Sequence, residues 1–357
     1  MEVEPTSAAS SLTEEEAALY DRQIRLWGAD AQKRLRVANV LLAGFRGILT
    51  EVCKNLVLAG VNNVTILDRD PIRPSDLAAQ FFLREEDVGK TRAEALERIQ
   101  VLNPQAKLTF ESADIADKDE DYLRAFNVIC ISTQTLATIE KVNGICRKHG
   151  IPFYAADSFG YRAFFFADLG GHSYIVEEEK PKEDEKEKEN GKRSGAVDAQ
   201  PPVKRQRTEA EEPPAPKTGT VVAASPLFDI VHKVNWGHAS MRRVPKLFFA
   251  SLLLYMWSGE HGRRPYGLTS DEQARLVEQK NAFLKKHSLR DNFLTDDFLL
   301  ETARTAGAEL SPICAIVGGI LGQQVIKVIS AKGEPEVHNL FFYDARSAMG
   351  TVEAITV

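Results

Sequence analysis

Cysteine is scarce in this sequence, and its few cysteines are not arranged for metal binding. The 357 residues contain four, at Cys53, Cys130, Cys146 and Cys314, and none belongs to a Cys-x-x-Cys pair. A structural zinc site normally uses closely spaced thiolates, so we expect no zinc. All four stand in apolar segments with strand or helix patterns, which favours buried, reduced thiols over an exposed reactive thiolate.

Long apolar runs and an excess of positive charge are also missing. The longest apolar stretch, Leu247 to Trp257, is about half of the ~20 residues that a membrane span needs, so we expect a core helix and no membrane partner. Met1 to Leu12 is polar and acidic, unlike a signal peptide. The formal net charge of -6 gives no reason to expect nucleic-acid binding.

Alternating strand and helix patterns predict an α/β fold with a mostly parallel sheet. Residues 37–43 form an apolar run of strand length, residues 48–59 carry apolar residues at helical spacing, and residues 64–68 form the next strand. Further strands are predicted at 107–111, 128–132, 152–157 and 339–344, and helices at 92–102, 122–126, 136–149, 247–257, 270–287, 295–306 and 312–330. Helices should cover both faces of such a sheet.

The turn after the first strand resembles a nucleotide-binding loop that has lost its binding residues. Nucleotide-binding folds place Gly-x-Gly-x-x-Gly here. Gly44 and Gly47 are present, but Arg46 and Leu49 stand at the second and third glycine positions. A side chain at position 46 blocks the close approach of a phosphate, and a leucine at position 49 separates helix and strand unless both adjust. Asp68 ends the second strand, where it could bind a ribose hydroxyl or make a structural hydrogen bond, and the damaged loop favours the second.

An arginine-containing helix is predicted near the amino terminus. Thr13 and Glu16 form the pattern of a capping box, and the helix should continue through residues 20–27 to Gly28. One interpretation of this segment is a surface helix, with Asp21 and Arg25 spaced for an ion pair. The other is that Arg22 reaches a triphosphate as a charge clamp, in cis or in trans.

Together these segments resemble the activating enzymes of ubiquitin and its relatives. The string Tyr-Asp-Arg-Gln-Ile-Arg-Leu-Trp-Gly at 20–28 is the most specific, and the other matching segments are Leu-Ala-Gly-Val at 58–61, Gln-Phe-Phe at 80–82, Asp-Val-Gly-Lys at 87–90, and residues 312–320 and 341–344. The similarity covers residues 13–175 and 300–350. It implies a Rossmann-like adenylation fold of the ThiF/MoeB type.

Within that family the chain is most similar to the smaller, non-thioester-forming subunits of heterodimers that activate SUMO. The resemblance implies that the larger catalytic subunit binds MgATP, adenylates the SUMO C-terminus, accepts SUMO as a thioester and passes it to the SUMO-conjugating enzyme. It also implies that Arg22 contacts the ATP phosphate in the partner, with Arg25 in a supporting role. This chain alone would then be inactive.

Departures from the family pattern support this expectation. Residues 75–79 lack the arginine that normally holds phosphates, Arg92 replaces a lysine, and residues 132–135 lack the carboxylate that holds Mg²⁺. The resemblance therefore implies that Gly44, Gly47 and Asp68 belong to a degenerate site that binds no nucleotide of its own. Two alternatives stay open: the regulatory subunit for NEDD8, which generally has a larger helical insertion, and a stand-alone adenylating enzyme of the sulfur-carrier type.

The composition divides the chain into five parts. We expect a disordered N-terminus at 1–12, the first part of the adenylation fold at 13–176, a disordered charged linker at 177–220, a helical insertion at 221–302, and completion of the fold at 303–357.

His149 and His172 have no partner at ligand spacing, so no metal is assigned. The linker carries two basic clusters with the spacing of a bipartite nuclear import signal, formed by Lys192, Arg193, Lys204, Arg205 and Arg207. The alternative is that these residues are only solvated charges in a linker. We favour the import signal, and hence a nuclear protein.

Overall fold

The computed structural model describes residues 13–176, 217–221, 224–238 and 243–355. The predicted N-terminal segment, and residues 177–216 of the predicted linker with all five basic residues of the import signal, lie outside the described residues.

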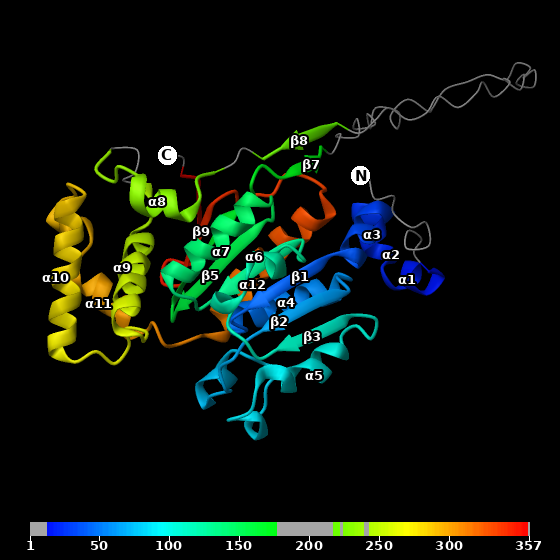
Figure 1. The fold of residues 1–357 in the computed structure, drawn as a ribbon, viewed down its shortest axis with the longest axis horizontal. Helices are drawn as coiled ribbons and strands as arrows, with labels where there is room; N and C mark the ends of the chain where they lie inside the picture. Colours follow the sequence, from blue (N-terminus) through cyan, green and yellow to red (C-terminus); the bar gives the residue numbers. More distant parts are fainter. Residues whose placement is uncertain (1–12, 177–216, 222–223, 239–242, 356–357) are drawn as a thin grey trace, which may run out of the picture.

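An eight-stranded sheet forms the centre of the described chain, in the order β10-β9-β6-β5-β4-β1-β2-β3 (Figure 1). Its strands are β1 (Asn39–Ala43), β2 (Asn63–Leu67), β3 (Lys107–Glu111), β4 (Val128–Ser132), β5 (Phe153–Phe159), β6 (Arg162–Asp168), β9 (Leu340–Asp344) and β10 (Met349–Glu353). Strands β1 to β5 pair in parallel, whereas β6, β9 and β10 pair antiparallel. The predicted α/β fold is confirmed, but β6 and β10 were not anticipated.

Strand β5 extends beyond the strand predicted at 152–157. The strand continues to Phe159, so Asp157 lies within it, and Gly160 with φ +67° makes the tight turn into β6. A Cβ at Gly160 would lie 2.7 Å from the Thr305 side chain, so a close approach also requires glycine here.

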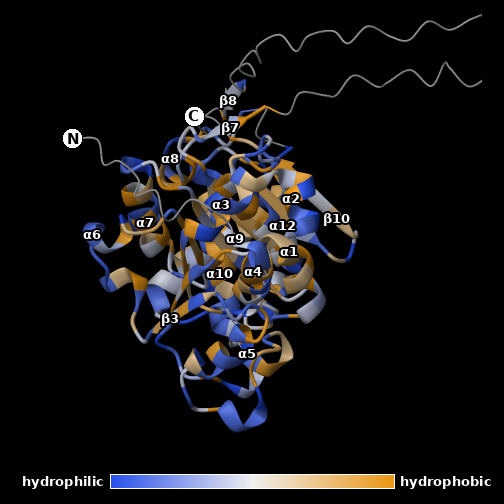
Figure 2. Cartoon of the chain, turned by 90° about the vertical axis from the view of Figure 1, so that its right-hand side faces the viewer, coloured by the Kyte–Doolittle hydropathy of each residue, from blue (hydrophilic) through white to orange (hydrophobic). Residues whose placement is uncertain are grey.

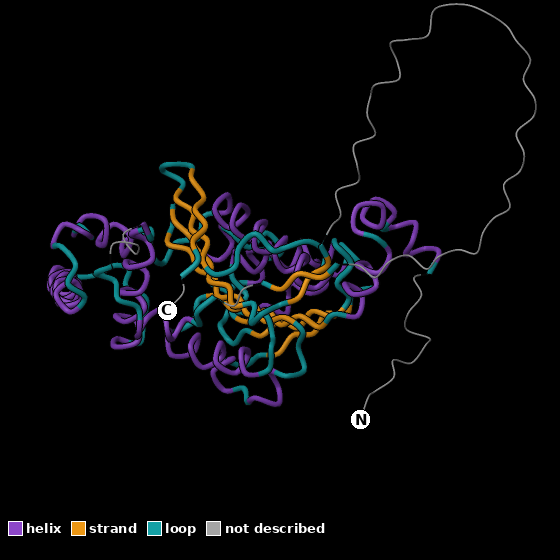
Figure 3. Tube along the Cα trace, turned by 90° about the horizontal axis from the view of Figure 1, so that it is seen from above, coloured by secondary structure: helices purple, strands orange, loops and turns teal. Residues whose placement is uncertain are grey.

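Helices cover both faces of the sheet. One face carries α3 (Ala29–Val37), α4 (Gly47–Leu58), α5 (Leu96–Gln100) and α12 (Ser311–Ser330), and the other carries α6 (Glu120–Leu123), α7 (Leu136–Lys148), α8 (Leu227–Lys233) and α9 (Lys246–His261). Alternation along β1 explains the two cores: Val40 and Leu42 join one, and Leu41 joins the other. Figure 2 shows the apolar residues concentrated around α4 and α12, and Figure 3 shows the strands as a twisted band between helices.

Helix α12 is the one helix in the described ranges that is long and apolar enough to cross a membrane by length and composition. It packs instead against α4, and 61% of its apolar window is buried. The two helices approach closely at Gly318 of α12, which packs directly against α4. A Cβ at this position would lie 2.7 Å from Ile48 O. We therefore identify α12 as a core helix.

The amino-terminal segment forms two short helices, α1 (Glu14–Leu19) and α2 (Asp21–Trp27), where one was predicted. The capping box is confirmed: Thr13 Oγ1 accepts a bond from Glu16 N, and the Glu16 carboxylate accepts one from Thr13 N. The break falls at Tyr20, whose buried hydroxyl accepts a hydrogen bond from Asn103 Nδ2 at 2.9 Å. Gly28, with φ +88°, ends α2 as predicted.

A group of helices made by α9, α10 (Ser270–Lys286) and α11 (Asp296–Arg304) lies at the opposite end of the molecule from α1 and α2 (Figure 1). Helix α11 runs across the predicted boundary at residue 302. The predicted helices at 92–102 and 122–126 are shorter or shifted, as a 3-10 turn (Arg92–Ala95) followed by α5 and as α6.

The predicted linker boundary at residue 220 is wrong. Strand β8 (Thr218–Thr220) pairs with β7 (Ser173–Ile175) in a separate two-stranded sheet. This strand has the sequence Thr-Gly-Thr, so it lacks the alternating apolar residues that predict a strand. Gly219 is nevertheless required by packing, because a Cβ there would lie 2.5 Å from the Tyr174 ring.

Candidate functional site

The candidate site is the sheet edge at the carboxyl ends of β1, β2 and β4, where open α/β sheets place their ligand crevice, and we call this edge the cleft. Strand β1 lies between β2 and β4, so the chain leaves it in one direction and later continues from β4 to β5 in the other. Open α/β sheets bind their ligands at such a switch point. The structure brings the turn at Gly44 and Gly47, the carboxyl group of Asp68 and the end of β4 to this edge, as the sequence predicted.

Gly44 and Gly47 both have packing roles in the turn. Gly44 has φ +76°, and a Cβ there would lie 2.1 Å from Ser132 O. A Cβ at Gly47 would lie 2.7 Å from Cys314 Sγ, where α4 begins against α12. Leu49, which we expected to separate helix from strand, is fully buried in the core on this face. Packing therefore explains why glycine stands at positions 44 and 47, without a bound nucleotide.

Ion pairs fill the half of the cleft next to β2. Arg46 donates hydrogen bonds to Asp70 at 2.7 Å and to Asp76 at 2.8 Å. Arg92, which is fully buried, donates to Asp68 at 3.1 Å and to Asp76 at 2.5 Å. Burial is the largest influence on two of these groups: it raises the pKa of Asp68 and lowers the pKa of Arg92, and their mutual attraction opposes both shifts.

Asp68 makes the structural hydrogen bonds of the second interpretation. Besides Arg92, it accepts a hydrogen bond from Asp70 N at 2.9 Å, and its side chain is almost completely buried. Both of these bonds go to Oδ1 of a carboxyl group that is buried within the fold and paired with Arg92. The residues present therefore do not fit a nucleotide in the manner of the complete fold.

The other half of the cleft is closed by contacts to the helical group. Asp157 is buried in β5 and pairs with Arg264, and the Tyr255 hydroxyl donates a hydrogen bond to it at 3.0 Å. The Arg264 guanidinium also lies over the Phe159 ring, 5.5 Å from its centroid. Sequence reasoning missed this pairing because 107 residues separate its two charged partners.

Glu309 is a further residue that sequence reasoning missed. Gly47 N, the first amide of α4, lies 3.2 Å from Glu309 Oε1 and 3.1 Å from Glu309 Oε2. Burial raises the pKa of Glu309, while the Gly47 amide and the Arg46 and Arg264 guanidinium groups oppose this rise. No local pattern marks Glu309, because it stands 262 residues from Gly47.

Arg22 is placed very differently from the arginines of the cleft. It is exposed on α2 and makes no hydrogen bond or ion pair with any residue in the described ranges. Its neighbour Gln23 donates a hydrogen bond to Leu58 O, at the carboxyl end of α4, whereas the cleft lies at the amino end. The 12 residues of α4 separate the two ends by about 16 Å. This distance argues against Arg22 as a clamp for the cleft of its own chain.

Arg25 makes the ion pair that its spacing predicts. Its Nε lies 2.9 Å from Asp21 Oδ2, and both side chains are largely exposed. Such pairs contribute at most about 0.5 kcal/mol, so this contact does not fix the role of Arg25.

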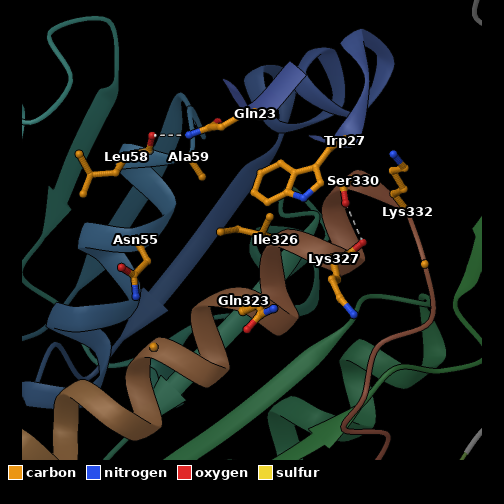
Figure 4. A pocket seen from close by; sticks show the side chains of 12 residues that line it. Gln23, Trp27, Asn55, Leu58, Ala59, Gln323, Ile326, Lys327, Ser330 and Lys332 are labelled. Carbon is orange, nitrogen blue, oxygen red and sulfur yellow. Dashed lines mark hydrogen bonds between the residues drawn. The ribbon is translucent and has the colours of Figure 1, made fainter. Parts of the chain in front are cut away.

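A groove of about 620 Å³ runs along α2, between α4 and α12 (Figure 4). Trp27 and Ile326 lie next to each other in it, and Gln23 bonds across to Leu58. Leu26, on the same helix, is 66% exposed. An apolar surface thus adjoins the exposed Arg22.

The four cysteines are buried and free, as predicted. Burial raises the pKa of the Cys53 thiol to about 12 and that of Cys146 also to about 12. A thioester nucleophile needs a thiolate near neutral pH, so neither of these thiols is suited to that role.

Comparison with known proteins agrees with this architecture. Residues 20–356 match the ThiF family. This chain belongs to the ThiF family. Three similar relatives of this ThiF-family chain are named SUMO-activating enzyme subunit 1: that of Homo sapiens is 37% identical over 99% of each chain, that of Bos taurus 36% identical over 99% of each, and that of Danio rerio 33% identical over 96% of this chain and 95% of the relative.

Solved structures support the same fold. The ThiF-family chain superimposes on E. coli MccB, crystallised with succinimide, with a TM-score of 0.52 and 14% sequence identity. The match covers 98% of this chain and 74% of MccB. At that identity the likeness concerns the fold alone, and it confirms the predicted ThiF/MoeB-type fold.

Proposed function

We propose that this chain is the smaller subunit of a heterodimeric SUMO-activating enzyme. The larger subunit would bind MgATP, which supplies the adenylyl group that activates the SUMO C-terminus. This chain would contribute Arg22 to the partner's site and would bind no nucleotide itself. The relatives named SUMO-activating enzyme subunit 1, which match this chain along nearly its whole length, support the proposal.

The observation that carries the proposal is the contrast between paired and unpaired arginines. Arg46 and Arg92 are held by carboxylates inside the cleft, whereas Arg22 projects from the surface without a partner among the described residues. Because the Arg22 guanidinium cannot reach the cleft of its own chain, any phosphate that it contacts must be bound by another molecule. In trans, such a group stabilises the charge that develops during phosphate chemistry.

The surface around Arg22 supports association with a second chain. Leu19 and Leu26 are 64% and 66% exposed, and the groove lined by Trp27 lies beside them. Exposed apolar patches bordered by polar residues are typical of protein–protein interfaces. A partner that receives Arg22 would also cover this patch.

Arg22→Ala in the assembled heterodimer tests the proposal. We expect ATP–pyrophosphate exchange to fall by about 100- to 1,000-fold, the usual loss when one charge-stabilising donor is removed. Copurification with the partner should be unchanged, because Arg22 makes no contact that holds α2 in place. Lys33→Ala, which removes a half-exposed cation from the adjacent helix α3, is the matched control and should leave exchange unchanged. Unchanged exchange in Arg22→Ala, or equal loss of assembly, would contradict the proposal.

The alternatives receive less support. A stand-alone adenylating enzyme would need an open nucleotide site in this chain, and the cleft is filled with ion pairs. The names of the relatives favour SUMO over NEDD8 as the modifier.

We further propose that the heterodimer enters the nucleus through the basic clusters of residues 192–207. The support is their bipartite spacing alone. A fluorescent full-length chain with Lys204→Ala and Arg205→Ala should accumulate in the cytoplasm, and an unchanged nuclear signal would exclude this role.

A further inference from the structure

The amino end of α4 is occupied by a carboxyl group that belongs to the chain itself. Helix N-termini bind phosphates because their first amides lack partners and the helix dipole is positive there. Here the Glu309 carboxyl group takes the Gly47 amide with both oxygens, at 3.2 and 3.1 Å. The N-cap residue, Arg46, provides no side-chain cap for the helix. Glu309 thus does for α4 what a bound phosphate does in a nucleotide-binding fold.

Backbone contacts on both sides hold Glu309 in this position. Gly160 N donates a hydrogen bond to Ala308 O at 3.0 Å, and Thr305 Oγ1 donates to Phe159 O at 2.8 Å. On the other side, Leu310 O accepts the first bonds of α12. The segment between α11 and α12 is therefore attached to the β5–β6 turn, and Glu309 is fixed where it meets α4.

The charged side chains closest to Glu309 are largely paired with one another. Three guanidinium groups and five carboxyl groups of described residues gather at this edge of the sheet: those of Arg46, Arg92, Arg264, Asp68, Asp70, Asp76, Asp157 and Glu309. Each guanidinium is bonded to at least one carboxylate. A triphosphate entering here would meet a formal excess of negative charge and an occupied helix end.

We infer that Glu309 is an internal ligand of α4, which occupies the phosphate position and keeps nucleotide out of this chain's cleft. The inference goes beyond the proposed function, because it concerns the cleft of this chain and does not depend on Arg22 or on a partner. It identifies a specific residue for the loss of nucleotide binding, in addition to the damaged glycine loop.

Calorimetry with inorganic pyrophosphate on the purified full-length chain tests this inference. Glu309→Ala removes the carboxyl group and should bind pyrophosphate at least tenfold more tightly than the natural chain. Glu309→Gln is the matched control: its amide oxygen can still accept from Gly47 N and fills the same space, so no gain is expected. Unfolding curves of each variant show whether the fold is retained. If Glu309→Ala does not fold, Glu309→Ser, which is equally short but polar, takes its place.

The outcomes separate clearly. A gain in the alanine or serine variant but not in the glutamine variant supports an internal ligand. Equal binding by the natural chain and the alanine variant, or no gain in any variant, overturns it. An equal gain in Glu309→Gln also overturns it as stated, since occupancy by the side chain would then not matter. None of these results alters the expectation for Arg22, so the two proposals can fail separately.

Discussion

The cleft and the exposed face of α2 contain the same chemical group in opposite circumstances. In the cleft, Arg92 is fully buried between two carboxylates. On α2, Arg25 makes one exposed ion pair, and Arg22 makes none with the described residues. Arginine content alone therefore does not identify a phosphate site. What matters is which guanidinium groups remain available, and Arg22 on α2, which is available, lies far from the cleft.

The comparison also separates structural from functional requirements. The buried ion pairs of the cleft need both partners, because removing one partner leaves an uncompensated charge in the core. An exposed arginine can be removed with little cost to the fold. Stability measurements therefore test the cleft, and activity measurements test α2.

Arg92→Met should give the largest loss of stability. The substitution leaves the Asp68 and Asp76 carboxyl groups buried without their shared cation, which we expect to cost about 3–5 kcal/mol. The measurement is urea unfolding of the full-length chain at neutral pH. Arg25→Ala, which breaks an exposed pair, should cost at most about 0.5 kcal/mol.

Similar losses of stability in Arg92→Met and Arg25→Ala would contradict the distinction between a buried, paired cleft and an exposed surface. A loss of about 1 kcal/mol or less in Arg92→Met would mean that the cleft repacks around Asp68 and Asp76, with water entering to solvate them. The cleft would then not be the rigid, self-paired structure described above.

How much of this could be read from the sequence depends on how far apart the interacting residues stand. The capping box at Thr13 and the helix at 311–330 were predictable because the pattern and the structure are both local. Arg46 and Leu49 were likewise recognised as damage to the glycine loop from their positions alone. The ThiF-type fold was implied by the resemblance of residues 20–28 and other short segments to a known family, and it was confirmed.

The contacts that close the cleft could not be read in this way. Glu309 meets Gly47 across 262 residues, and Arg264 meets Asp157 across 107, through folding of the helical group onto the sheet. Strand β6 was missed because the turn that separates it from β5 spans only two residues, too short a break to mark two strands in the sequence. Charge in a sequence does not reveal its partner until the topology is known.

Gly44→Ala and Gly28→Ala extend the comparison to the backbone, with a smaller expected difference. Both glycines have positive φ, +76° and +88°, so alanine is strained at either position. Gly28, at the end of α2, has no atom within 4 Å of its added Cβ, whereas at Gly44 that Cβ would lie 2.1 Å from Ser132 O. Gly28→Ala should therefore cost about 1–3 kcal/mol, for backbone strain alone.

Gly44→Ala should cost about 1–3 kcal/mol more, because β1 and β4 must also move apart at their carboxyl ends. Urea unfolding of the two variants measures the difference directly. Equal costs would show that the turn relaxes without disturbing β4, and close packing would then not explain the glycine at position 44.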